Sequence, residues 1–292
     1  RQRVAFALSQ IFVISLTDNV VREHPRGVAA YMDMLGKHAF GNFRNLLEDV
    51  SLHPMMGLYL SHLRNQKEDT ASGRVPDENY AREVMQLFSI GLYQLEPDGR
   101  VRTGANGQPL EAYTDADIRG LARVFTGFSW YAGPNPGDRT RSRFFGGNAN
   151  ADRDWQPMQA YPEFHSTSEK RFLGAVVPAQ GTADPQASLK VALDTLAAHP
   201  NVGPFIGRQL IQRLVKSNPS PAYVGRVAAA FADNGAGVRG DLKAVIRAVL
   251  LDPEARAVTA GDATEGKLRE PVLRLAHFLR AFGATSRSGR FS

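Results

Sequence analysis

Glu83, Asp115 and His165 carry side chains that suit them to proton transfer. Carboxylates and imidazoles act as general acids and bases in enzymes, and two carboxylates together can cleave a glycosidic bond. Asn79 and Arg82 precede Glu83 on one predicted helix, and Asn79 shares a helix face with Glu83 because the two are four positions apart. We therefore interpret Glu83 as the acid/base residue, assisted by His165 and Asp115, with Asn79 and Arg82 as substrate contacts.

The segment 129–174 holds the other candidate substrate contacts, Trp130, Trp155 and Lys170. It shows no helical periodicity, and glycines and prolines interrupt it. Long segments of this kind in a compact domain are usually functional or disordered, and a high density of aromatic residues argues against disorder. We expect a long aromatic loop that folds back over the helices and forms one wall of a cleft.

Each candidate also has a structural interpretation. The polar face of the predicted helix could be solvated, with one ion pair between Glu78 and Arg82. His165 could be a hydrogen-bonded structural residue. His53 and His199 each precede a proline, and we interpret both as structural residues, with His53 at a helix cap or in the core.

Several catalytic classes lack their usual residues. The chain has no cysteine, which excludes disulfides, thiolate nucleophiles and zinc–thiolate sites. It contains no Gly-x-Ser-x-Gly elbow, no His-Glu-x-x-His and no P-loop sequence. The stretch 235–240 is spelled like a dinucleotide-binding turn, but it joins two predicted helices. Carboxylates, amides and histidines remain, which suit acid/base chemistry or hard metal ions.

Asn148, Asn150, Asp152 and Asp154 alternate oxygen ligands as in a calcium-binding loop. The glycine and the glutamate that such a loop carries at its sixth and twelfth positions are absent. We favour a solvated polar turn, with calcium as the weaker alternative, and we predict no other cofactor or metal.

Net charge and hydropathy indicate whether the protein binds nucleic acid or spans a membrane. The formal net charge is +6 and the sequence pI is near 9.7. The arginines are spread along the chain beside acids, and no basic patch with interleaved aromatic residues is present, so we expect no nucleic-acid binding. The apolar run 4–16 is too short to span a bilayer, so we expect no transmembrane segment there.

Helical periodicity predicts the two helices that carry Glu83 and Asp115. Asp77 is the expected N-cap and Gly91 the expected end of the helix that carries Glu83. Thr114 and Asp117 form an expected capping box ahead of the next helix.

The same pattern organises the rest of the chain. Turn sequences between residues 94 and 109 predict a small β-hairpin. Further predicted helices cover 3–16, 26–50, 55–63, 185–199, 204–216, 221–234, 241–251 and 269–282. The sequence therefore predicts an all-α fold, with one multi-helix domain over 1–292 and a C-terminal helical subdomain at 185–282.

Two stretches resemble a known family. They are Asp-Glu-Asn-Tyr-Ala-Arg-Glu-Val-Met-Gln-Leu-Phe-Ser-Ile-Gly at 77–91 and Tyr-Thr-Asp-Ala-Asp-Ile-Arg-Gly-Leu-Ala-Arg-Val-Phe-Thr-Gly-Phe at 113–128. Both closely resemble the signature of the bacterial domain-of-unknown-function 1800 family, and the similarity covers essentially the whole chain. The resemblance implies a mostly helical, exported protein. It also implies that residues 1–12 lie well inside the family's protein, so that this chain is the C-terminal portion of a longer one.

The chain departs from the family at two positions. The family motif that aligns with Phe164 and His165 continues with Asp and a later Lys, and here Ser166 takes the Asp position. Gln86 takes a position that is often Glu in the family. Two carboxylates are therefore missing from the acidic set that the resemblance implies.

We expect a secreted or periplasmic hydrolase that cleaves a glycosidic or ester bond, with a polysaccharide or an ester as substrate. The alternative is a non-catalytic envelope protein that binds a polymer or a protein partner through the aromatic loop. An enzyme should show Glu83 at an open pocket, whereas a scaffold should show it closed in an ion pair.

Overall fold

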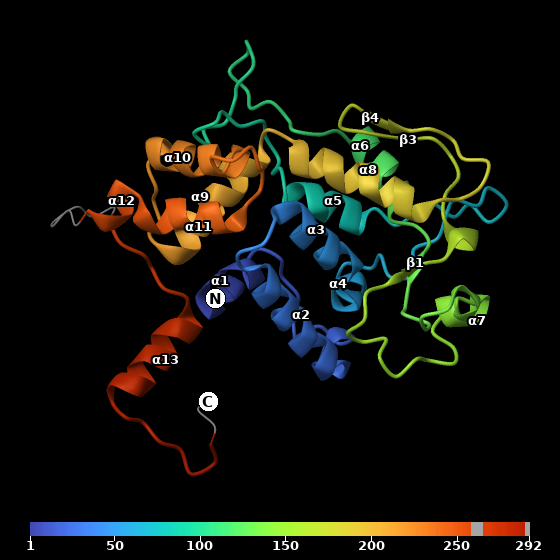
Figure 1. The fold of residues 1–292 in the computed structure, drawn as a ribbon, viewed down its shortest axis with the longest axis horizontal. Helices are drawn as coiled ribbons and strands as arrows, with labels where there is room; N and C mark the ends of the chain where they lie inside the picture. The colour runs from blue at the N-terminus through green and yellow to red at the C-terminus, as the bar shows by residue number, and fades with distance from the viewer. Residues whose placement is uncertain (258–264, 290–292) are drawn as a thin grey trace.

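The computed structural model of the chain describes residues 1–257 and 265–289, and helices dominate these residues (Figure 1). The first half contains α1 (Gln2–Ser9), α2 (Pro25–His38), α3 (Phe43–Leu52), α4 (Pro54–Tyr59), α5 (Asn79–Gln86), α6 (Asp115–Val124) and α7 (Arg141–Phe144). The second half contains α8 (Pro185–Ala198), α9 (Val202–Leu214), α10 (Pro221–Ala232), α11 (Leu242–Leu251), α12 (Pro253–Arg256) and α13 (Pro271–Ala281). The described residues form a mostly helical single domain, which confirms the predicted fold class.

Two small antiparallel sheets lie in the region where periodicity is lost. One pairs β1 (Phe128–Ser129) with β2 (Gln159–Ala160), and the other pairs β3 (Lys170–Phe172) with β4 (Ala175–Val177). Strands of two or three residues are too short to leave an alternating pattern in the sequence, which is why they were not predicted. The predicted hairpin at 94–109 forms through isolated antiparallel bridges, Leu95 to Val101 and Thr103 to Pro109.

The predicted helix 26–50 is wrong as one element, because the chain breaks between α2 and α3. Asn42 has an extended backbone, and its Oδ1 accepts a hydrogen bond from the backbone N of Arg44 at 2.9 Å. An asparagine cap starts a new helix, and the apolar pattern continues across the break because both helices face the same core. The first helix likewise ends at Ser9, well before residue 16.

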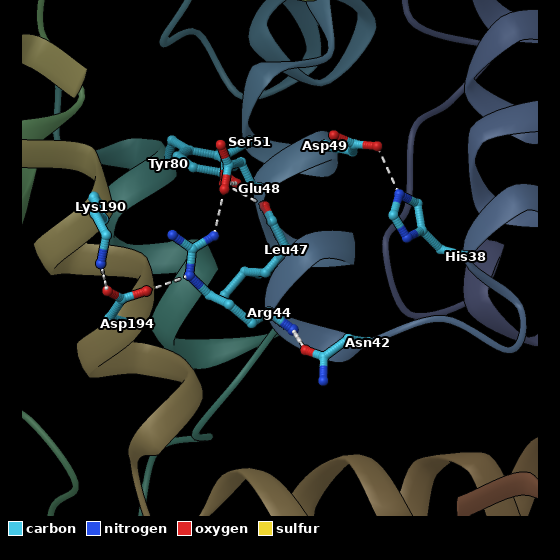
Figure 2. A network of polar contacts seen from close by, with 10 residues as sticks. All are labelled: His38, Asn42, Arg44, Leu47, Glu48, Asp49, Ser51, Tyr80, Lys190 and Asp194. Carbon is cyan, nitrogen blue, oxygen red and sulfur yellow. Dashed lines mark hydrogen bonds and ion pairs between the residues drawn. The ribbon is translucent and has the colours of Figure 1, made fainter. Parts of the chain in front are cut away.

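One hydrophobic core runs through the molecule, from Val4 in α1 to Val249 in α11. Helices α9, α10 and α11 pack against one another, and they lie together on one side of Figure 1. Helix α8 packs mainly against α3, α6 and β4, with a smaller contact to α9. Charged side chains also join α8 to α3, since Arg44 Nε donates to Asp194 at 2.6 Å and Lys190 donates to the same carboxylate (Figure 2).

The aromatic segment 129–174 folds back over the helices, as expected. Trp130 joins the main core, while Phe144, Tyr161 and Phe164 form most of a second, smaller cluster. The rings of Phe144 and Phe164 stack with their centroids 3.7 Å apart. These aromatic side chains therefore hold the segment in place and are buried in doing so.

The last described helix, α13, extends away from the body in Figure 1, and none of its residues is buried. No helix in the described ranges is both long enough and apolar enough to cross a membrane.

Candidate functional site

Helix α5 carries the candidate acid on a well-defined scaffold. The predicted ends of this helix are wrong by a few residues, because Glu78 rather than Asp77 is the N-cap and the helix ends at Gln86 rather than near Gly91. Asp77 Oδ1 still accepts a hydrogen bond from the backbone N of Asn79 at 2.8 Å. The helix is followed by Gly91, whose φ of +75° is one that glycine adopts without strain. Tyr80 and Val84 are fully buried on the inner side of the helix, so its orientation in the fold is fixed.

The carboxylate of Glu83 is half-buried and lacks the partner that a structural acid would have. Its Oε2 is buried without a hydrogen-bond partner, and no ion pair holds Glu83 within the described part of the chain. Arg82 pairs instead with Glu78, at 3.5 Å. Burial raises the pKa of Glu83, and the charge of Arg82 offsets this only in part. An acid of this kind keeps its proton to a higher pH than a solvated carboxyl.

A polar pocket of about 460 Å³ lies between α5 and α6, and Arg82 and Gln86 of α5 line it, whereas Glu83 is not among its lining residues. It contains side chains from α5, from the bridged segment that follows it, and from the start of α6. Those used below are Arg82, Gln86, Tyr93, Glu111, Tyr113 and Asp115. The Tyr113 hydroxyl donates to Gln86 Oε1 at 3.3 Å. Burial raises the pKa of Tyr113, the charge of Arg82 lowers it, and the charges of Glu83 and Glu111 raise it further.

A capping box sets the position of Asp115 at the first turn of α6. Thr114 Oγ1 accepts from the backbone N of Asp117, and the Asp117 carboxylate accepts from the backbone N of Thr114. Asp117 Oδ1 also accepts from the backbone N of Leu173 at 2.7 Å, which ties α6 to β3. The local sequence therefore places Asp115 in the pocket lining. Asp117 instead caps α6 and accepts from the backbone of Leu173, directly after β3.

His165 lies in a second, buried group of polar side chains. Its Nδ1 donates to the Thr126 carbonyl oxygen at 2.8 Å, and its Nε2 lies 3.1 Å from Ser188 Oγ. His165 is fully buried, and this burial lowers its pKa to about 4. The charged groups that act on it are Lys170, Asp184 and Glu68, and neither Glu83 nor Asp115 is among them. The imidazole is thus neutral near pH 7, and His165 does not line the pocket between α5 and α6.

Lys170 lies in the same group and is also fully buried. Its Nζ donates to the Ser168 carbonyl oxygen at 3.3 Å, and burial lowers its pKa to about 8. The hydroxyls of Ser166 and Ser168 both donate to Glu68 Oε1. A serine at the family's Asp position thus contacts a carboxylate from another part of the chain.

Glu68 is the residue that sequence reasoning missed. It lies in the polar loop 64–75, which carries no periodic signal, and Ser166 is 98 positions away. Its Oε2 is buried without a hydrogen-bond partner within the described residues. The signal available in the sequence was indirect: a Ser in place of an Asp leaves room for a carboxylate supplied from elsewhere.

The tryptophans are not exposed platforms. Trp130 is buried, and the guanidinium of Arg153 lies 4.6 Å from its ring centroid. The guanidinium of Arg26 covers Trp155 at 3.9 Å. The last predicted contact, Asn79, is exposed at the start of α5.

Asn150 and Asp154 of the calcium-like run both have polar partners within the protein. Asn150 Oδ1 accepts from the backbone N of Asp152 at 2.9 Å, and Asp154 pairs with His24 at 3.1 Å. In residues 1–257 and 265–289, no three His, Asp or Glu side chains are grouped so that they could hold a metal ion.

The geometry thus defines a mainly helical single domain with a polar pocket between α5 and α6 and a half-buried, unpaired carboxyl group on α5. A family model described as Protein of unknown function (DUF1800) matches residues 1–290, and the chain belongs to this family. No curated protein and no solved structure shows a significant match to the chain.

Proposed function

We propose that the chain is a hydrolase that binds a polyhydroxylated substrate in the pocket between α5 and α6 and cleaves a glycosidic bond there. The observation that carries this proposal is the unpaired, half-buried Glu83 on α5, whose chain neighbour Arg82 lines a pocket together with Asp115. Glycan sites combine carboxylates, amides and aromatic faces, and Tyr93, Tyr113 and Gln86 add the last two kinds of group.

Glu83 acts as the general acid in this proposal. Its raised pKa keeps the proton that the leaving oxygen needs. Because Glu83 does not line the pocket in this structure, a change of its side-chain rotamer must bring the carboxyl group into the pocket. Asp115 is the second carboxylate, which attacks the sugar or activates a water molecule from the other side. Tyr113 and Arg82 hold the hydroxyl groups of the substrate.

The rival function has less support. A polymer-binding scaffold was expected to use the aromatic loop, but Trp130, Phe144, Tyr161 and Phe164 are buried in the two apolar clusters. The resemblance to exported proteins leads us to propose the periplasm or the extracellular space as the site of action, with a polysaccharide as the partner.

The test is a panel of aryl glycosides and aryl esters with good and poor leaving groups. Glu83→Gln is expected to lower kcat/KM on poor leaving groups by about 100-fold or more and to have a smaller effect on 4-nitrophenyl glycosides, which need little proton donation. Activity of the unmodified chain on poor leaving groups should fall as the pH rises through the raised pKa of Glu83. Glu163→Gln, which removes an exposed partner of Arg141, is the control and should leave the rates unchanged.

Two results would overturn the assignment. Cleavage of the esters without cleavage of any glycoside would exclude glycosidase chemistry. Equal losses on good and poor leaving groups would show that Glu83 does not donate the proton.

A further inference from the structure

A second pocket, of about 520 Å³, lies between α3, α8 and the sheet of β1 and β2. Its volume falls in the range of small-molecule sites. The apolar part of its lining includes Phe128, Met158 and Leu189, all buried at the surface of the main core. It shares no lining residue with the pocket between α5 and α6, so it is a separate site.

Two of the three cations at this pocket are neutralised by the protein. Arg44 is held between Glu48 and Asp194, and Lys190 donates to the far oxygen of Asp194 at 2.6 Å (Figure 2). These contacts hold the Arg44 guanidinium in place across α3 and α8 and leave its charge compensated.

The third cation, Arg139, has no such partner. Within the described ranges, the Arg139 side chain makes one weak hydrogen bond, to the Ala160 carbonyl oxygen at 3.5 Å, and forms no ion pair. Arg139 is half-buried. When Asp194, which pairs with Arg44 and Lys190 but does not line the pocket, is counted with the lining residues, the pocket has one positive charge in excess, above an apolar floor.

We propose that this pocket binds a small organic anion with an apolar body and a single carboxylate. The carboxylate pairs with the Arg139 guanidinium, which can donate two parallel hydrogen bonds to it. The apolar body lies on Phe128, Met158 and Leu189. One excess positive charge matches a monoanion, whereas a phosphate dianion would leave one negative charge uncompensated and an ammonium group would meet a like charge.

The first experiment is calorimetric titration of the chain with sodium octanoate, with 1-octanol and octylammonium as matched probes. Octanoate should bind saturably with a 1:1 stoichiometry, and the other two should bind at least about tenfold more weakly. Equal binding of octanol would mean that only the apolar floor acts. Equal or tighter binding of octylammonium, or no binding of octanoate, would overturn the proposal.

Two substitutions test the role of charge. Arg139→Gln removes the excess cation and should weaken octanoate binding by about tenfold or more. Gln186→Glu adds a carboxylate to the pocket lining and should weaken it similarly. Gln186 is exposed in the first turn of α8, where a negative charge is compatible with the helix, so this variant decides the matter if Arg139→Gln does not fold.

Arg171→Gln is the matched control, since Arg171 is exposed, pairs with Glu169 and does not line this pocket. Its affinity for octanoate should equal that of the unmodified chain. Unchanged affinity in Arg139→Gln and Gln186→Glu, with both variants folded by circular dichroism, would exclude the proposed site.

Discussion

At the scale of single residues, hydrogen-bond partners distinguish Glu83 from His165, although burial acts on both in the same way. The charged form of each is disfavoured, so the Glu83 carboxyl tends to keep its proton and the His165 imidazole tends to stay neutral. His165 has hydrogen-bond partners on both ring nitrogens, while Glu83 Oε2 has none among the described residues. A group with satisfied partners stabilises the fold, and a group without them is available for chemistry.

Glu83→Gln should leave the melting temperature unchanged or raise it by a few degrees, because it removes a charge that burial disfavours and breaks no ion pair. Differential scanning calorimetry measures this directly. The matched control is Glu254→Gln, because Glu254 pairs with Lys216 and accepts from Ser220. That control should lose about 1–2 kcal/mol of unfolding free energy. A clear fall in melting temperature for Glu83→Gln would assign Glu83 a structural role.

Buried histidines should make the fold sensitive to acid. His53, His62 and His165 each have a pKa lowered by burial from 6.5 to about 4. Below pH 6.5 the unfolded chain binds protons that the folded chain does not, so the free energy of unfolding falls as the pH drops from about 6.5 to about 4. Each histidine contributes up to about 3 kcal/mol to this fall.

Urea titrations between pH 7 and pH 4 test this expectation. His165→Asn, whose amide can replace the Nδ1 donor to Thr126, should flatten the pH profile. His277→Asn, an exposed change on α13, should give the same profile as the unmodified chain. A His165→Asn profile as steep as that of the unmodified chain would show that His165 does not contribute to the acid sensitivity.

At the scale of elements, helix caps position the pocket. The capping box of Thr114 and Asp117 fixes the first turn of α6, where Asp115 meets the side chains of α5. Loss of the cap frees backbone donors at this turn and lets it fray. Stability and pocket geometry should therefore change together.

Thr114→Ala should lower the free energy of unfolding by about 1 kcal/mol, because the Asp117 backbone N loses its acceptor. Chemical denaturation measures the loss. Thr182→Ala, at an exposed loop position, should change stability little. Equal stability of the two variants would show that the cap contributes nothing to the fold.

At the scale of the whole molecule, α6 and β3 approach each other so closely that one position excludes a side chain. A Cβ at Gly120 would lie 1.8 Å from the carbonyl oxygen of Arg171. Lys170 and Arg171 belong to β3, so this contact presses the strand onto the helix beside the buried group of His165 and Lys170. Helix and sheet can keep this spacing only with glycine at 120.

Gly120→Ala should destabilise the fold by about 1–3 kcal/mol, since backbone atoms must move apart to admit the methyl group. Gly36→Ala in α2 is the matched control, because a Cβ there has no atom within 4 Å. It should raise stability by about 0.5–1 kcal/mol, as alanine favours a helix over glycine. Comparison of the two denaturation midpoints is the measurement, and a stabilised Gly120→Ala would contradict the close packing of α6 on β3.

The sequence by itself determined the features that depend on neighbouring residues. The helix starts at Pro185 and Pro221, the box of Thr114 and Asp117, and the turn at Gly91 follow from contacts within a few positions of the chain. The fold class could be predicted for the same reason, since helical periodicity is local.

Only the tertiary structure decided which side chains are buried and which meet across the fold. It brought Glu68 to Ser166, buried His165 against Ser188, and left Arg139 beside an apolar floor without a carboxylate partner within the described residues. Burial and partner choice depend on packing between segments up to about a hundred positions apart, and the strength of a hydrogen bond or a charge depends on that burial. A spacing pattern could therefore nominate Glu83 and His165 alike, and only their surroundings showed that His165 has partners on both ring nitrogens while Glu83 Oε2 has none among the described residues.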